Sequence, residues 1–190
     1  MLWTPCPPSV GVVKTRPMRN TLRLIVLILS LSGMSALWNS ASATHVAGGY
    51  IQLQCTGTPG QYILRLVLYR DCGGATLGNT ATVTATNTCG LGTQNFTVTR
   101  VSTTEVSQLC AAQLNQSECS GGTLPGYQEV IYTATINIGA CNTWTFAYSL
   151  CCRNSSINVS GQPTFYTTTT LNSATNNCNT TPLMTAQPEP

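Results

Sequence analysis

The sequence predicts an all-β fold, an antiparallel β-sandwich that is immunoglobulin-like in outline and stabilised by disulfides. After residue 44, short runs of alternating or β-branched residues are separated by turn signals, and helical periodicity is almost absent. The same region is rich in Thr, Ser, Asn and Gly, which suit pleated strands and turns. It also holds nine of the ten cysteines, a density typical of exported domains with disulfide frameworks. A jelly roll or a barrel is the alternative architecture.

An export signal is predicted at the amino terminus. The chain opens with the basic residues Lys14, Arg16, Arg19 and Arg23, and residues 22–38 are otherwise almost wholly apolar. Ala41 and Ala43 then occupy the small-residue positions that signal peptidase reads. We therefore expect residues 1–43 to be a signal peptide that touches the membrane only before its cleavage. The apolar run is shorter than the ~20 residues that span a bilayer, and an uncleaved signal anchor is the alternative.

The remaining chain is divided into one domain and a tail. We expect the β-sandwich domain to occupy residues 44–172, and residues 173–190 to form a C-terminal tail. Met18 is a second candidate start, and translation from it would leave residues 1–17 outside the protein.

Seven strands are predicted in the domain. The segment 103–119 has room for a short helical turn. Pro followed by Gly in Thr58-Pro59-Gly60 and in Leu124-Pro125-Gly126 predicts two type II turns. The predicted strands cover residues 49–56, 61–71, 80–87, 94–101, 128–138, 143–152 and 163–171.

The core-facing side of each strand follows from the alternation of side chains along it. Four apolar rows should close the core, one from each of four predicted strands. They are residues 51, 53 and 55, residues 64, 66 and 68, the even-numbered residues from 130 to 138, and the even-numbered residues from 144 to 152. The last row contains Trp144 and places Cys152 inward, with Cys151 on the opposite side. Cys55–Cys152 is therefore the predicted bridge through the core.

Geometry limits the other pairings, because bridged cysteines need Cα atoms about 4.4–6.8 Å apart. An extended strand would separate Cys141 from Cys151, and a hairpin would place Cys55 opposite residue 62, away from Cys72. A bridge between adjacent Cys151 and Cys152 would need a strained ring, whereas Cys110 and Cys119 could close a local loop. The disulfide candidates are Cys55, Cys72, Cys89, Cys110, Cys119, Cys141, Cys151 and Cys152. Nine is odd, and Cys178, beyond the last strand, is the one expected to stay unpaired.

Charge excludes several classes of function. The whole chain carries eight basic and five acidic residues, but residues 44–190 keep only four arginines beside all five acids, a net charge of −1. This gives no basic patch for nucleic acid. One histidine and scattered carboxylates supply no catalytic triad, no paired-carboxylate site and no clustered calcium ligands. We therefore expect neither an enzyme nor a bound cofactor or metal.

Three polar positions have a functional reading beside a structural one. Arg70 and Asp71 could form a contact site, but a strand-end ion pair that orders the following Cys-Gly-Gly turn is favoured. Arg153 could bind a partner carboxylate, and capping of a loop carbonyl is favoured. His45 would be the second residue after cleavage and could chelate copper with the new terminal amine; a solvated terminus is favoured.

An ordered set of motifs gives the chain a family resemblance. The stretches THVAGGYIQLQC, YILRLVLYRDCGG, PGYQEVIYTATI, CNTWTFAYSLCCRN and NNCNTTPLM occur in this order. They resemble the N-terminal module of large exported Bacteroidota proteins of the adhesin-like or gliding-motility-associated kind. Those chains continue beyond this region into further β-sandwich repeats and a sorting domain. Here the chain stops at Pro190, which indicates a truncated reading frame or a free-standing copy.

The resemblance implies a structural or interaction role with no catalytic residues to transfer. We expect a secreted, non-enzymatic structural or adhesive module, periplasmic or extracellular, whose partner is a surface protein or a glycan. A carbohydrate-binding module using exposed aromatic side chains is the first alternative. A non-catalytic appendage of a secreted hydrolase is the second.

Overall fold

The computed structural model describes residues 46–151, 153, 164–176 and 178–184. All seven predicted strands are present in it within a few residues of their expected bounds, and helix is confined to two short 3₁₀ turns. The strands are β1 (Val46–Cys55), β2 (Gln61–Asp71), β3 (Thr80–Asn87), β4 (Gln94–Glu105), β5 (Tyr127–Asn137), β6 (Trp144–Leu150) and β7 (Phe165–Leu171).

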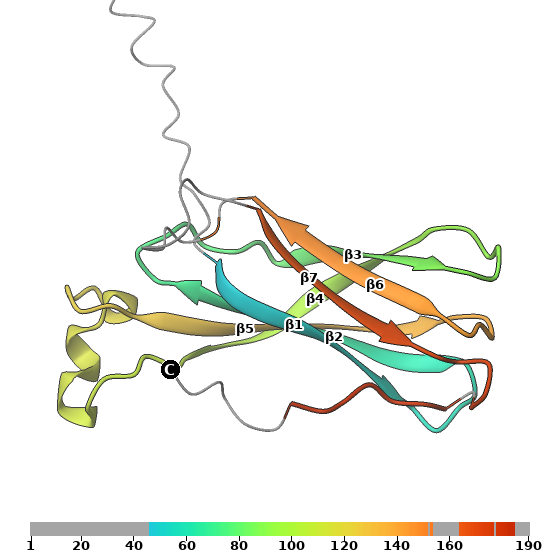
Figure 1. Cartoon of the computed structure of the whole chain (residues 1–190). Coiled ribbons are helices and arrows are strands. Elements are labelled where there is room, and N and C mark those ends of the chain that lie inside the picture. Colours follow the sequence, from blue (N-terminus) through green and yellow to red (C-terminus); the bar gives the residue numbers. More distant parts are fainter. Residues whose placement is uncertain (1–45, 152, 154–163, 177, 185–190) are drawn as a thin grey trace, which may run out of the picture. The chain divides into compact units, whose positions relative to one another are not determined.

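The strands form one antiparallel sheet with the order β1-β2-β5-β4-β3-β6-β7. Read as two halves, β1-β2-β5-β4 and β3-β6-β7, this is the strand order of an immunoglobulin constant-type domain. The halves are joined because β3 pairs with both β4 and β6. The sheet folds over its own core so that its edge strands β1 and β7 contact each other (Figure 1). The predicted all-β antiparallel fold is confirmed, with the sheet nearly closed.

The first hairpin is set by its turn. Gly60 has a φ of 77°, a left-handed conformation that suits glycine, and the Gln61 N–H donates to the Thr58 carbonyl at 3.0 Å. The predicted type II turn at Pro59-Gly60 is thus confirmed, and Cys55 lies opposite Tyr62 as expected. This register faces the leucines of β2 towards the core.

The core is built from the apolar rows that alternation predicts. Alternate side chains of β2, β5 and β6 are buried or, at Ala134 and Leu150, partly buried. The largest fully buried side chains are Trp144, Tyr62, Tyr132 and Phe146. Burial raises the pKa of Tyr62 and of Tyr132, and raises that of Tyr148 to about 12. The Tyr132 hydroxyl donates to the Gly78 carbonyl at 2.8 Å, so its polar end is satisfied.

The segment between β4 and β5 departs from the expected pattern. β4 runs four residues further than predicted, because a register shift between Arg100 and Ser102 lets it resume pairing with β5. Val101, at the shift, is 61% exposed. The expected helical turn is present as two 3₁₀ helices, η1 (Ala111–Gln116) and η2 (Glu118–Ser120).

The second predicted type II turn, at Leu124-Pro125-Gly126, is wrong. Gly126 lacks the positive φ that such a turn requires at this position. It is buried instead, and an added Cβ would lie 2.7 Å from the Cys119 Sγ and 3.0 Å from the Cys119 backbone nitrogen. Glycine is needed here because the chain passes close to a disulfide.

The segment after β7 returns along β1. The buried Thr181 side chain accepts a hydrogen bond from the Leu53 N–H at 2.9 Å, and the Thr181 N–H donates to the Leu53 carbonyl at 2.9 Å. The Thr180 hydroxyl accepts from the Cys55 N–H at 3.2 Å. Residues 178–184, assigned from sequence to a tail, are therefore hydrogen-bonded to the free edge of β1. No helix within the described residues is long and apolar enough to cross a membrane.

Candidate functional site

Three disulfides cross-link the described residues. They join Cys55 to Cys178, Cys72 to Cys119, and Cys89 to Cys141, with Cα–Cα distances of 5.1, 5.0 and 5.8 Å. These separations lie within the usual range for a disulfide. Cys151 is exposed and is also disulfide-bonded. Each of these cysteines was a predicted candidate except Cys178.

Three predictions about cysteines are wrong. Cys178 is not unpaired but bonded to Cys55, which excludes the predicted Cys55–Cys152 bridge. The physical reason is the return of residues 178–184 along β1, which brings Cys178 to the end of that strand. Cys119 does not close a local loop with Cys110, because it reaches the end of β2 at Cys72 instead. The inward orientation predicted for Cys152 lies outside the described residues.

Cys110 is the free cysteine of the described residues, and it is exposed. It precedes η1, in the stretch that contributes no residue to the buried core. Cys110 and Cys119 are close in sequence, with only η1 lying wholly between them, so local closure looked plausible from the sequence. The turns instead present Cys119 to the end of β2.

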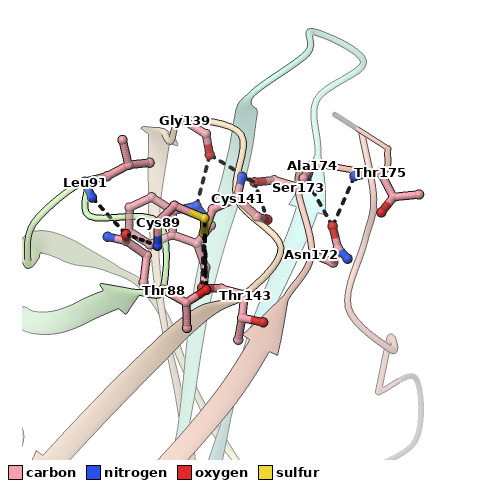
Figure 2. The surroundings of a disulfide bond; sticks show 12 residues. Thr88, Cys89, Leu91, Gly139, Cys141, Thr143, Asn172, Ser173, Ala174 and Thr175 are labelled. Atoms are coloured by element: carbon pink, nitrogen blue, oxygen red, sulfur yellow. Dashed lines mark hydrogen bonds between the residues drawn. A yellow bond between two sulfur atoms is a disulfide. The ribbon is translucent and has the colours of Figure 1, made fainter.

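The Cys89–Cys141 disulfide is embedded in a hydrogen-bonded network (Figure 2). The Ser173 hydroxyl, 1% exposed, donates to the Gly139 carbonyl at 3.0 Å and accepts from the Cys141 N–H at 3.0 Å. The indole Nε1–H of Trp144 donates to the same Gly139 carbonyl at 3.0 Å. The network ties the loop before β6 to the chain after β7, so these polar groups serve structure.

Arg70 and Asp71 both form hydrogen bonds within the scaffold. The Arg70 guanidinium donates to the Ala75 carbonyl at 2.8 Å and to Gln128 Oε1 at 3.1 Å. Burial lowers the pKa of Arg70. The Asp71 carboxylate accepts from the Gly73 N–H at 2.9 Å, which orders the turn after β2 as predicted.

Two further carboxylates are held in hydrogen bonds of the scaffold. Glu129 accepts from the Tyr69 hydroxyl at 3.0 Å, and burial together with this bond raises the pKa of Tyr69. Glu105 accepts from the Ser107 and Ser117 hydroxyls at 2.7 and 2.5 Å. Within the described ranges no three His, Cys, Asp or Glu residues are grouped as a metal site would need. His45 lies outside those ranges, so the solvated terminus favoured for it and the copper site weighed against it are both untested.

The hydrogen bonds of Glu105 are expected to make the stability of the domain depend on pH. The hydroxyls of Ser107 and then Ser117 lower the pKa of Glu105 below its ordinary value of 4.5, so its ionised form favours the folded state. The stability it supplies is complete above the unfolded-state pKa and is lost as the pH falls through the lower folded-state pKa. We expect Glu105→Gln to lose less stability than the wild type between pH 7 and pH 3 in urea unfolding. Equal losses in both proteins would contradict this role.

One outer surface of the sheet is rich in threonine and carries no charge. Outward positions on β3, β4, β6 and β7 place threonines opposite one another across the strands, as in Thr80–Thr99, Thr82–Thr97 and Thr145–Thr170. We call this surface the threonine face. It consists of Thr80, Thr82, Thr84, Thr86, Thr97, Thr99, Thr145, Thr168 and Thr170. Tyr166, 64% exposed, stands at its end on β7.

A small pocket lies on the outer side of β1 and β2. It has a volume of about 180 Å³ and is lined by Gln52 and Gln54 of β1, Ile63 and Arg65 of β2, and Leu183 and Met184. Gln52 stands opposite Arg65 in the sheet, and Gln54 opposite Ile63. The Nε of Arg65 is buried and has no hydrogen-bond partner. A buried donor left without an acceptor costs roughly 1–3 kcal/mol, so this group is exceptional in the fold.

Neither surface was predicted from the sequence. The alternation in TATVTATN and QNFTVT shows which threonines face outward, but their alignment across strands needs the register. The pocket was missed, because two of its six residues come from the segment assigned to a tail. Arg153, the other arginine singled out from sequence, is exposed and forms an isolated bridge with Val46.

The fold and these surfaces define an antiparallel, disulfide-stabilised β-domain with immunoglobulin-type strand order. The chain matches no known family model, no curated protein and no solved structure.

Proposed function

We propose that the chain is a secreted, non-enzymatic structural or adhesive module of the cell surface or extracellular space. The threonine face is the observation that carries this proposal. Its hydroxyl and methyl groups can hydrogen-bond and pack against a neutral surface, and no charge at these outward positions has to lose its hydration on contact. The face rests on a cross-linked sheet, so it is ordered before contact and little conformational entropy is lost on binding.

Other observations support export and a non-catalytic role. Three disulfides suggest an oxidising, extracellular or periplasmic environment, in agreement with the signal peptide proposed for residues 1–43. Asp71, Glu105 and Glu129 are engaged in bonds that order the scaffold. The motif resemblance to exported adhesin-like modules of Bacteroidota agrees with the same proposal.

The test is adhesion of beads coated with the protein under shear flow. The full chain is expressed with export to the periplasm, and bead retention is measured on bacterial cell-surface polysaccharide and on uncoated glass. Thr82→Glu and Thr168→Glu place charges in the threonine face and are expected to reduce retention several-fold. Thr123→Glu adds the same charge at an exposed loop position and serves as the control. Retention that is unaffected by the face variants would overturn the proposed role of this face.

Carbohydrate binding is the second candidate, and the exposed Tyr166 favours it. Aromatic rings stack on sugar rings, and this ring adjoins hydroxyl side chains that could bond sugar oxygens. On a glycan array, selective binding that is lost in Tyr166→Ala would favour a carbohydrate-binding module. Binding that is equal across unrelated glycans would favour the general adhesive role.

A further inference from the structure

Arg65 has a buried side-chain nitrogen, Nε, that no group of the described scaffold satisfies. Arg70 is bonded to Gln128 and to loop carbonyls, and Arg100 to Asn79 and the Leu77 carbonyl. By contrast, no hydrogen bond or ion pair joins the Arg65 guanidinium to any residue that the structure describes. The Arg65 guanidinium, with its positive charge and its buried Nε–H, is therefore available to bind an acceptor from outside the domain.

The chemistry of the pocket narrows that acceptor to a carboxylate. A guanidinium presents a planar fork of donors that matches the two oxygens of a carboxylate, and such charge-assisted pairs are the stronger hydrogen bonds. The amide of Gln54 adds a further donor at the pocket wall, whereas the Gln52 Nε2 already donates to the Pro182 carbonyl at 3.4 Å. None of the described residues that line the pocket is acidic, so an incoming carboxylate meets no like charge from them.

The size and walls of the pocket select the kind of partner. Its volume, about 180 Å³, is below the roughly 300–1,000 Å³ typical of pockets that enclose a whole small molecule. It can therefore hold one side chain of a larger partner. Ile63, Leu183 and Met184 provide apolar walls suited to the methylene groups of a glutamate. None of the lining residues that the structure describes has an aromatic ring to support a sugar.

We propose that this pocket binds an acidic segment of a partner protein, which inserts one glutamate or aspartate carboxylate against Arg65. The carboxylate pairs with the guanidinium while the rest of the partner lies across the outer side of β1 and β2. This site is separate from the threonine face, so the inference goes beyond the proposed adhesive role and can fail without it.

The test is a nuclear magnetic resonance titration of the full chain, purified after export to the periplasm. The probes are a hexapeptide with one glutamate between threonines and valines, the same peptide with glutamine in its place, and an oligogalacturonate. The glutamate peptide is expected to shift the Arg65 Nε–H resonance and the amides of residues 52–54 and 63–65. We expect the glutamine peptide to bind at least about tenfold more weakly, a difference of about 1.4 kcal/mol.

Variants separate the pocket from general charge attraction. Arg65→Gln is expected to weaken binding of the glutamate peptide by at least about tenfold, and Arg65→Lys should retain part of it because the charge remains without the fork. Arg153→Gln removes an exposed arginine elsewhere and is expected to bind like the wild type. Unchanged thermal unfolding of Arg65→Gln and Arg65→Lys would show that a loss reflects the site and not the fold.

Three results would overturn the proposal. Equal binding of the glutamate and glutamine peptides would exclude carboxylate recognition. Arg65-dependent binding of the oligogalacturonate without binding of either peptide would assign the pocket to an acidic polysaccharide. A shift of the Arg65 Nε–H resonance caused by Glu189→Gln alone would assign the pocket to this chain's own carboxylate.

Discussion

Replacing Cys55 and Cys178 together by serine is expected to lower the free energy of unfolding by about 3–5 kcal/mol. The two residues are 123 positions apart, so their bond closes nearly the whole described domain into one loop. In the chain-entropy model, a loop of this length restricts the unfolded chain by about 5 kcal/mol, and measured losses on removing native disulfides are about 2–5 kcal/mol. Urea unfolding followed by the fluorescence of Trp144 measures the change.

The matched control for this double variant is Cys110→Ser. Cys110 is free and exposed, so its substitution should change the unfolding free energy by no more than about 0.5 kcal/mol. A double variant as stable as the wild type would show that the hydrogen bonds of Thr181 to Leu53 hold the returning segment without the disulfide.

Trp144→Ala is expected to destabilise the domain by about 3–5 kcal/mol. The Trp144 side chain is fully buried, and its ring lies 6.2 Å from that of Phe146, centroid to centroid. Its removal leaves a cavity beneath β6. The Gly139 carbonyl keeps the Ser173 hydroxyl as a donor, so the loss comes mainly from packing and not from an unpaired group. Circular dichroism in urea follows unfolding, because Trp144 is the sole tryptophan after residue 43.

Two aromatic variants bracket this result. Trp144→Phe keeps most of the buried ring and should cost distinctly less than Trp144→Ala. Tyr166→Ala removes an aromatic side chain that is 64% exposed and should cost about 0.5 kcal/mol or less. If Trp144→Ala cost no more than Tyr166→Ala, the region around Trp144 would have to collapse freely, against the close packing of the core.

The strands could be predicted because their signals are local. Alternation along β2 and β6 identifies both the strand and its buried side, and the Pro59-Gly60 turn fixes the first register. Burial of Trp144, Phe146 and Tyr148 followed from alternation alone.

The failures depend on contacts between distant residues. The register shift beside Val101 extends β4, and no residue pattern marks it. At Gly126 the Pro-Gly signal was misleading. Glycine is required there because a side chain would clash with the nearby Cys119, and not because the backbone has a positive φ. The disulfide partners of Cys55 and Cys72 were missed for the same reason: each lies on a segment without strand character, whose path is set by tertiary hydrogen bonds.

Of the two candidate surfaces, one follows from local sequence signals and the other depends on contacts between distant residues. The threonine face could be anticipated because it obeys strand alternation, whereas the Arg65 pocket needs Leu183 and Met184 to return beside β1. An arginine on the outer side of a strand looks ordinary in a sequence. Its buried, unpaired Nε becomes visible only when the surrounding residues are placed.

The Cys55–Cys178 bond also determines how the domain responds to mechanical tension. A force that pulls residues before Cys55 away from residues after Cys178 passes through the disulfide and bypasses the strands between them. The residues between the two cysteines would extend by roughly 3.3–3.6 Å each. The disulfide therefore prevents the release of chain with a contour length on the order of 400 Å, which would be released on unfolding if the bond were absent. Under load, a tether containing this domain would therefore stay short and stiff until that disulfide is reduced.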